Sequence, residues 1–440
     1  MADALAGIWH DIPAPAQDLL VFGALLLPAL VTGFVVAYGY RPSRLVGAMI
    51  WRYRWTNALF VVLIAVSVGI GVGLIAQERG LRSGTARAAE KFDLVVTAPG
   101  SEVQMLLATV YLQPVDVALL DGALMSEIAG HPNVDLAAPI AYGDSYDGYP
   151  VIGTTSGFLR HLSGDLAEGN VFAEHPEAVI GANVGLRLGD HFEPAHGVGH
   201  EAEDGAHEGH EPVVVGRMAP TGSPWDKAIL IPVETVWEMH GLANGHRPEA
   251  EEQIGPPFDP DYFPGTPAIL VRANALWANY ALKSEFTRAD AMAFFPGTVL
   301  AQLHGLLGDV RQIMSVMAVV TQILVTAGVL AGLLVLSRLY ARGLALLRAL
   351  GAPRRFVFSI VWCHAAALIA AGTMLGLIFG ILATRIISRI VSERTDILVE
   401  ASLGWPELHL IAAFVSLTVV LSLLPSFSAL RRPVISDLRG

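Results

Sequence analysis

Hydrophobic residues fall into five long and almost uninterrupted stretches, at residues 19–38, 57–75, 312–336, 356–384 and 409–424. Stretches of about 20 apolar residues are typical of helices that cross a bilayer. The first stretch has no basic residue before it and no small-residue cleavage site after it, so we expect a retained helix with an external N-terminus rather than a signal peptide. The pattern predicts a membrane α-helical bundle of about five transmembrane helices.

A different pattern fills residues 77–307, where short apolar runs alternate with Gly, Pro and Asp turn signals. The runs FDLVVTA, EAVIGA, PVVVGRM, KAILIPV and PAILVRA predict strands, and residues 119–129 and 232–240 predict helices. We therefore expect an inserted α+β extracytoplasmic domain. A helical stripe runs on from this domain into the third apolar stretch and predicts a rigid stalk; it consists of Val299, Leu303, Leu306, Leu307, Val310 and Met314.

The composition agrees with a membrane protein and excludes several other classes. Of 440 residues, 53% are hydrophobic and 15% charged, and the net charge is −12 without a basic patch for nucleic acid. The single Cys363 excludes an intrachain disulfide. None of the lysines follows a glycine-rich phosphate-binding loop, and no nucleophile elbow or zincin helix is present. We therefore expect a subunit without catalytic residues of its own.

Arginines beside the apolar stretches are concentrated on one predicted side of the membrane. Cytoplasmic loops carry an excess of basic residues, and an external N-terminus followed by five helices places all of these arginines inside. The residues concerned are Arg41, Arg44, Arg52, Arg54, Arg338, Arg342, Arg348, Arg354, Arg355, Arg431 and Arg432.

Two short basic segments stand out among these arginines. In residues 340–355, Leu344, Leu347 and Arg348 share one helical face and Gly351 is placed to end the helix. This segment either docks on a cytoplasmic partner or serves only as a topology signal. Residues 41–55 have an amphipathic pattern that predicts either a helix lying on the inner leaflet or a basic linker.

The segment 340–355 resembles the short helix after the second membrane helix in ABC permeases of the MacB, lipoprotein-releasing Lol and FtsX type. Gly343 stands where that family usually has glutamate. The phrases KFDLVVTAPGSEVQMLL and VVVGRMAPTGSPWDKAILIP resemble the family's extracytoplasmic domain, and PSFSALRRPVISDLRG resembles its closing segment. The matching residues of the helix are Arg342, Leu344, Leu347, Arg348, Ala349, Leu350, Gly351 and Ala352.

The resemblance implies a layout, partners and a role. It implies an interfacial elbow helix and membrane helix at 41–76, a MacB-like periplasmic domain at 77–307, and an FtsX-like permease domain at 308–440 with a coupling helix at 340–352. The extra N-terminal membrane helix at 1–40 departs from the family, which usually begins with the next element. In this family the coupling helix docks on a separate cytoplasmic ABC ATPase, which holds ATP and Mg²⁺. The chain would then transmit force across a bacterial inner membrane to its periplasmic domain, for export or extraction of a substrate. The implied coupling residues are Arg342, Leu344, Leu347, Arg348, Leu350 and Gly351.

Glycines repeat at four-residue spacing in three of the apolar stretches. Small residues on one face let membrane helices approach closely. The resembling permeases act as homodimers, and the resemblance implies that these glycines serve that contact. The expected packing residues are Gly372, Gly376, Gly380, Gly328 and Gly332, and Gly69 and Gly73 repeat in the same way.

Residues 190–211 interleave histidines with acidic residues and glycines, between flanks RLGD and PVVVGRM that predict two strands. Imidazole and carboxylate groups are good zinc ligands, but a solvated acidic hairpin with freely titrating histidines has the same composition. The expected metal ligands are His191, His196, His200, His207 and His210. A weaker cluster consists of His240, His246, Glu249, Glu251 and Glu252.

Two alternatives to a MacB/Lol-type transporter follow. One is a zinc-linked ABC transport component that gathers metal with the histidine-rich loop. The other is a non-transporting, FtsX-like scaffold that activates a periplasmic partner, where a transporter would instead move a cargo such as a lipoprotein.

Overall fold

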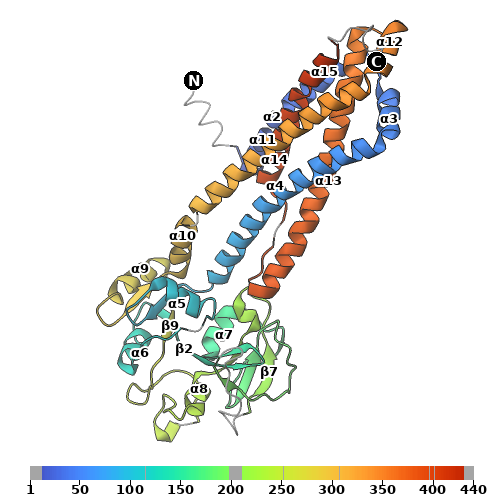
Figure 1. Cartoon of the computed structure of the whole chain (residues 1–440). Helices are drawn as coiled ribbons and strands as arrows, with labels where there is room; N and C mark the ends of the chain where they lie inside the picture. Colours follow the sequence, from blue (N-terminus) through green and yellow to red (C-terminus); the bar gives the residue numbers. More distant parts are fainter. Residues whose placement is uncertain are drawn as a thin grey trace. The chain divides into compact units, whose positions relative to one another are not determined.

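The computed structural model describes residues 12–113, 115–197, 211–250, 252–306, 308–395, 397–400 and 402–430. The chain forms two compact units (Figure 1). The helical unit consists of Met1–Gly80, Asp309–Ser388 and Ala401–Gly440, and the sheet unit of Leu81–Gly308 and Arg389–Glu400.

Long apolar helices build the helical unit. Side chains from α4, α11, α13 and α14 share one buried core, which includes Ile64, Val329, Ile360 and Phe414. The helices of this unit are α2 (Ala14–Ala37), α3 (Ser43–Arg52), α4 (Arg54–Ala89), α11 (Gly308–Leu339), α12 (Ala341–Ala349), α13 (Arg354–Thr395), α14 (Trp405–Leu421) and α15 (Leu423–Leu430), of which α4, α11 and α13 also supply residues to the sheet unit.

Five helical segments in the described part of the chain are long and apolar enough to cross a membrane. Each contains most of one apolar stretch of the sequence, because continuous hydrophobicity at this length favours a spanning helix. The segments are Ala14–Ala37, Arg54–Ala89, Val319–Leu336, Arg354–Arg394 and Trp405–Ser428.

Two helices continue well beyond the apolar stretches that predicted them. Helix α4 has 36 residues and ends at Ala89, and α13 has 42 residues and ends at Thr395. The apolar stretch at 356–384 therefore predicted too short a helix at its C-terminal end. The segment RIISRIVSERT contains no Gly or Pro, so the helix has no local reason to stop where hydrophobicity ends.

The predicted stalk corresponds to two helices, α10 (Pro296–Leu306) and α11. Leu307 lies between them, outside the described residues. An unbroken helix across this junction therefore stays a prediction.

A mixed sheet of ten strands forms the centre of the sheet unit. The strand order is β10-β1-β9-β2-β3-β8-β5-β7-β4, and β6 pairs with β2. Pairs β3–β8 and β5–β7 are parallel and the other named pairs are antiparallel. The strands are β1 (Leu94–Thr97), β2 (Val134–Tyr146), β3 (Tyr149–Thr154), β4 (Glu168–Gly169), β5 (Glu177–Ile180), β6 (Ala195–His196), β7 (Val213–Arg217), β8 (Ile229–Pro232), β9 (Ala268–Ala273) and β10 (Met292–Phe294).

Both faces of the sheet are buried. In β8, Ile229 and Ile231 belong to one hydrophobic cluster and Leu230 to another, because successive strand residues point to opposite faces. All five predicted strand runs form strands, as β1, β5, β7, β8 and β9. The helices of this unit are α5 (Glu102–Thr109), α6 (Gly122–Ala129), α7 (Ser156–Ser163), α8 (Val233–Met239), α9 (Leu276–Glu285) and α10, with short 3₁₀ turns η2 (Pro224–Lys227) and η3 (Pro248–Ala250).

One predicted strand does not form. The flank RLGD is a turn, in which Gly189 has a φ of 86° and the Arg187 N–H donates to Asp190 Oδ2 at 2.8 Å. Only an isolated bridge joins His191 to Val213, so the expected hairpin of RLGD with PVVVGRM was wrong. The positive φ at Gly189 and the Asp190 side chain favour the turn over an extended strand.

Candidate functional site

A β-bulge in strand β2 positions the acid of the candidate site. Tyr142 pairs with Ile152 and Asp144 with Val151, so the register shifts between them. Such a bulge inserts a residue and re-aims the side chains that follow. Here the carboxylate of Asp144 becomes buried, with a side-chain exposure of 1%.

Strand β6 presents a histidine directly opposite that acid. His196 pairs with Asp144 in the antiparallel register. The strand is fixed by two further bonds: Ser145 Oγ donates to the Gly197 carbonyl at 2.7 Å, and the Gly197 N–H donates to the Gly143 carbonyl at 2.8 Å. The imidazole of His196 is half exposed, at 54%.

Helix α8 ends at the second histidine. His240 is the C-cap of α8, and its Nδ1 lies 2.8 Å from the Val236 carbonyl oxygen. A carbonyl oxygen can only accept, so Nδ1 carries the proton and the neutral ring presents Nε2 as an acceptor. In the protonated ring Nε2–H can donate to Asp144, and this hydrogen bond raises the pKa of His240.

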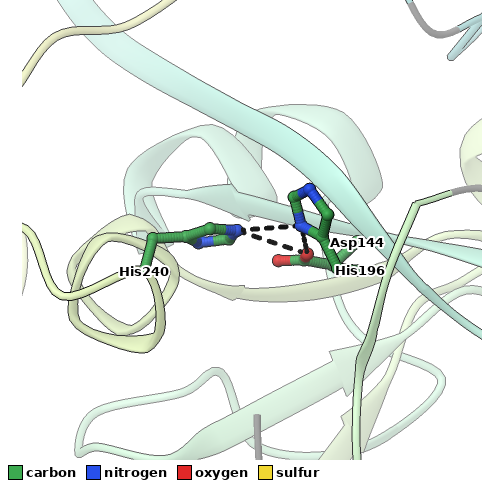
Figure 2. Close-up of side chains that lie close together, drawn as sticks. All are labelled: Asp144, His196 and His240. Carbon is green, nitrogen blue, oxygen red and sulfur yellow. Dashed lines mark hydrogen bonds and ion pairs between the residues drawn. The ribbon is translucent and has the colours of Figure 1, made fainter. Parts of the chain in front are cut away.

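These three side chains converge on one point (Figure 2). His196 Nδ1 lies 3.2 Å and His240 Nε2 lies 3.4 Å from Asp144 Oδ1, and the two nitrogens are 3.3 Å apart. Among the described residues this is the one group of histidines and acids whose ligand atoms are close enough to hold a metal ion together. The sheet unit thus has a candidate centre of two imidazoles and one carboxylate.

Of the five predicted loop ligands, the structure brings only His196 into this group. His191 is exposed and lies in the isolated bridge to Val213, while His200, His207 and His210 lie outside the described residues. Sequence reasoning missed Asp144, although an acid after glycine in the apolar run AAPIAYGDSY was a usable signal for a bulge.

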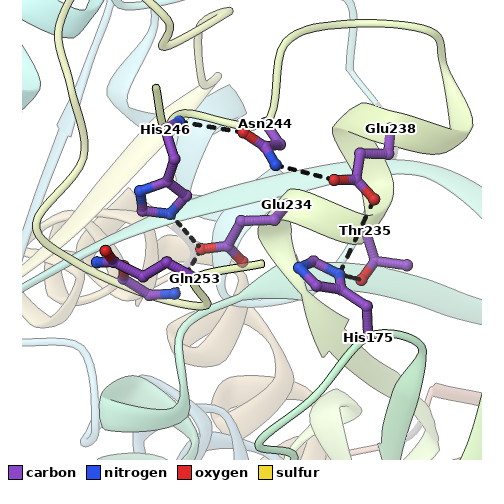
Figure 3. A network of polar contacts seen from close by, with 8 residues as sticks. His175, Glu234, Thr235, Glu238, Asn244, His246 and Gln253 are labelled. Carbon is purple, nitrogen blue, oxygen red and sulfur yellow. Dashed lines mark hydrogen bonds and ion pairs between the residues drawn. The ribbon is translucent and has the colours of Figure 1, made fainter. Parts of the chain in front are cut away.

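The weaker second cluster separates into different environments. His240 joins the candidate centre, whereas His246 faces Glu234 within the domain core at 3.6 Å, with side-chain exposures of 3% and 0% (Figure 3). Glu234 Oε1 also accepts from the Gly255 N–H at 2.6 Å. Glu249 and Glu252 are exposed, and Glu251 lies outside the described residues.

The network around α8 continues through its other polar residues (Figure 3). Asn244 Nδ2 donates to Glu238 Oε1 at 2.9 Å, and His175 Nδ1 lies 2.7 Å from Thr235 Oγ1. These contacts fix the helix that carries His240 at its end.

In the helical unit, α12 joins α11 to α13 and ends as the sequence predicts. Gly351 has a φ of 98°, and the Ala352 N–H donates to the Leu347 carbonyl at 3.0 Å. A left-handed glycine after the C-cap with such a bond is a common helix stop.

The two faces of α12 differ sharply in exposure. Leu344 is buried in the core of the helical unit, and Leu347 packs against that core. Leu346 is 55% and Leu350 78% exposed, on a face that also carries the exposed Arg342. Leu344 is therefore not available to a docking partner, which corrects the coupling role predicted for it. The solvent-exposed face of α12 instead carries Arg342, Gly343, Leu346 and Leu350.

Helix α3, in the other basic segment, also has an inner and an outer face. Val46 is buried, and Met49, Ile50 and Tyr53 pack against the same core. Trp51 and the neighbouring Trp55 are 73% and 80% exposed. Exposed tryptophans beside arginines are typical of a segment at a membrane surface, and that placement stays a prediction.

The glycine stripe of α13 packs against α4 of the same chain. A Cβ on Gly372 would lie 2.6 Å from Ile64 Cβ, and one on Gly376 would lie 2.7 Å from the Ala65 carbonyl oxygen. Gly380 similarly lies against Val72. Because α4 covers this stripe, it is not an open surface for a second copy of the chain, which corrects the dimer role expected for it.

The glycines of α11 differ from each other. A Cβ on Gly332 would collide with the ring of Phe60 on α4, whereas one on Gly328 would meet nothing within 4 Å. Gly69 contributes to the α4–α13 contact, since its Cβ would lie 3.2 Å from the Gly376 carbonyl oxygen. Gly328 therefore has no packing role within the described part of the chain.

Comparisons with known proteins identify the C-terminal part of the chain. Residues 315–434 match the family described as FtsX-like permease C-terminal. Among solved structures, the periplasmic region of MacB from Actinobacillus actinomycetemcomitans is similar at 12% identity, covering 50% of this chain and 95% of that one, with a TM-score of 0.30. The extracellular domain of the noncanonic ABC-type transporter YknZ from Gram-positive bacteria is similar at 10% identity, covering 46% and 98%, with a TM-score of 0.29. No curated protein matches.

The family match spans most of α11 and continues through α15, so it includes α12. It confirms the resemblance that the basic segment at 340–355 first indicated. The chain therefore carries an FtsX-like permease C-terminal domain at residues 315–434.

Proposed function

We propose that the chain is the membrane subunit of an ATP-driven transporter and that a separate cytoplasmic ABC ATPase docks on the outer face of α12. The observation that carries this proposal is the pair of exposed leucines, Leu346 and Leu350, on a short basic helix between two apolar helices. In this proposal the two exposed leucines supply the apolar part of the docking surface and the neighbouring Arg342 its charge. The ATPase supplies ATP and Mg²⁺ chemistry, for which this chain has no phosphate-binding loop.

Force transmission is the mechanism that fits this arrangement best. Leu344 fastens α12 to the core of the helical unit, so a push on its outer face would move α11 and α13 with it. Helices α4 and α13 contribute residues to both units, which supports transmission along continuous helices. In this proposal the sheet unit faces the periplasm of a bacterial inner membrane and responds to ATP binding and hydrolysis, as a homodimer with two ATPase copies.

A docking variant tests the proposal. Leu350→Asp adds a charge to the outer face of α12 without touching the core, so we expect the purified, tagged full chain to lose its ATPase partner. The measurement is the amount of a subunit with a Walker A sequence that co-purifies from native membranes, identified by mass spectrometry.

The matched control is Leu276→Asp, because Leu276 is an equally exposed leucine, at 80%, in the sheet unit. We expect this variant to retain the ATPase. Undiminished co-purification with Leu350→Asp and Leu346→Asp would contradict docking at this face.

A further inference from the structure

We propose that Asp144, His196 and His240 form a binding site for a divalent first-row transition ion, with Zn²⁺ the ion that suits them best. The site rests on the geometry of the sheet unit and is independent of the function proposed above. The distances among the three ligand atoms, their chemistry and their supports each point to a metal.

The spacing of the ligand atoms matches a tetrahedral ion. In a zinc site with bonds of about 2.0–2.1 Å, neighbouring ligand atoms lie about 3.3–3.4 Å apart. The observed separations are 3.2, 3.3 and 3.4 Å. Hydrogen bonds of the N–H···O type are most often about 2.9–3.0 Å long, so these contacts are looser than a well-formed hydrogen-bonded triad.

The electrostatics also favour a cation at the centre. His240 Nδ1 donates to the Val236 carbonyl, so its Nε2 brings a lone pair toward the carboxylate oxygen of Asp144. Two such acceptors repel one another unless a proton or a metal ion lies between them. The Asp144 side chain is 1% exposed, so water screens its charge poorly. The repulsion between the two acceptors is therefore stronger than it would be at an exposed site.

The supports of the ligands are those of a preorganised metal site. Metal-binding histidines usually donate their second ring N–H to a carbonyl or carboxylate, as His240 does. The β-bulge fixes Asp144, and Ser145 and Gly143 hold the strand that carries His196. Three separate elements, β2, β6 and α8, therefore meet at the ligand atoms.

The donor set selects the class of ion. Two imidazole nitrogens suit Zn²⁺, Co²⁺ or Ni²⁺, whereas Mg²⁺ and Ca²⁺ prefer oxygen ligands throughout. The half-exposed ring of His196 places the centre at the surface, where water can complete the coordination. A bound ion would link β6 to β2 and α8 through the three ligand side chains.

Calorimetric titration of the metal-free full chain in detergent with Zn²⁺ tests the site. We expect one equivalent to bind with a Kd of about 1 μM or tighter. His196→Ala should weaken that binding at least about 10-fold, because it removes a ligand whose exposed side chain is not needed for folding. Asp144→Asn should weaken it similarly, and Co²⁺ absorption in the visible range should disappear with either variant.

Two further variants separate this site from the histidine-rich loop. His191→Ala, an exposed histidine on the same stretch, should leave the affinity unchanged. Replacement of residues 198–210 by a Gly/Ser linker keeps all three proposed ligands and should preserve the one-equivalent binding. Loss of that binding with the linker, or its survival in His196→Ala, would overturn the proposal, as would the absence of binding in the unaltered chain.

Discussion

Buried acids in the sheet unit are each held by a specific set of partners. Asp226 accepts from the Thr221 N–H and hydroxyl at 2.7 Å each and from the Gly222 N–H at 2.8 Å. Glu234 accepts from the Gly255 N–H, so both acids anchor loops through backbone groups. Asp144 differs because it faces two imidazoles. The partners of a buried acid thus distinguish a structural role from a candidate ligand.

A prediction at this scale concerns the loop at Asp226. Asp226→Ala removes two carboxylate oxygens that accept three hydrogen bonds, at a residue that is 5% exposed, which should cost at least about 3 kcal/mol of local stability. Hydrogen exchange at residues 220–232 of the full chain should accelerate about 100-fold. The control Asp290→Ala removes an exposed ion pair with Arg288 and should change exchange little; equal effects of the two variants would contradict this account.

Among elements, the contact between α4 and α13 depends on glycine. The backbones approach so closely that a Cβ at Gly376 would lie 2.7 Å from the Ala65 carbonyl oxygen. The four-residue spacing of the glycines was visible in the sequence. Which helix they face was not, because the same pattern suits a neighbour in the same chain or in a second copy.

The prediction for this helix contact compares Gly376 and Gly328, which both belong to four-residue glycine repeats. Gly376→Ala should destabilise the purified chain in detergent by about 1–3 kcal/mol, since α4 and α13 must move apart. Gly328→Ala should have no destabilising effect, because its Cβ would meet nothing within 4 Å. The measurement is the midpoint of thermal unfolding for each variant, and a loss of stability confined to Gly328→Ala would refute the packing.

Over the whole molecule, regular patterns predicted more than local chemistry did. The period and length of the hydrophobic runs predicted the five apolar helices and five strands of the sheet. Gly351 ends α12 as predicted, because glycine readily adopts the positive φ of a helix stop. The candidate metal centre joins residues 52 and 44 positions apart in the chain, at Asp144, His196 and His240. The pairing of β6 with β2 brings His196 to Asp144, and the end of α8 brings His240; no local pattern specifies either placement.

The sequence pattern likewise did not determine which face of α12 is available for docking. Helical spacing placed Leu344, Leu347 and Arg348 together, and it left open whether that face points to the core or to a partner. The fold decides, because Tyr340 and Val357 lie in the core that buries Leu344. The opposite face, with Leu346 and Leu350, therefore carries the central functional claim.

Site-specific photocrosslinking in native membranes tests that claim most directly. A photoreactive amino acid would be placed at residue 350, at residue 346 and, as the exposed control in the sheet unit, at residue 276. We predict a crosslink from residues 350 and 346 to a subunit that carries a Walker A sequence, and none to that subunit from residue 276. A crosslink to the ATPase from residue 276 alone, or none from residues 350 and 346 while the two proteins still co-purify, would contradict docking on α12.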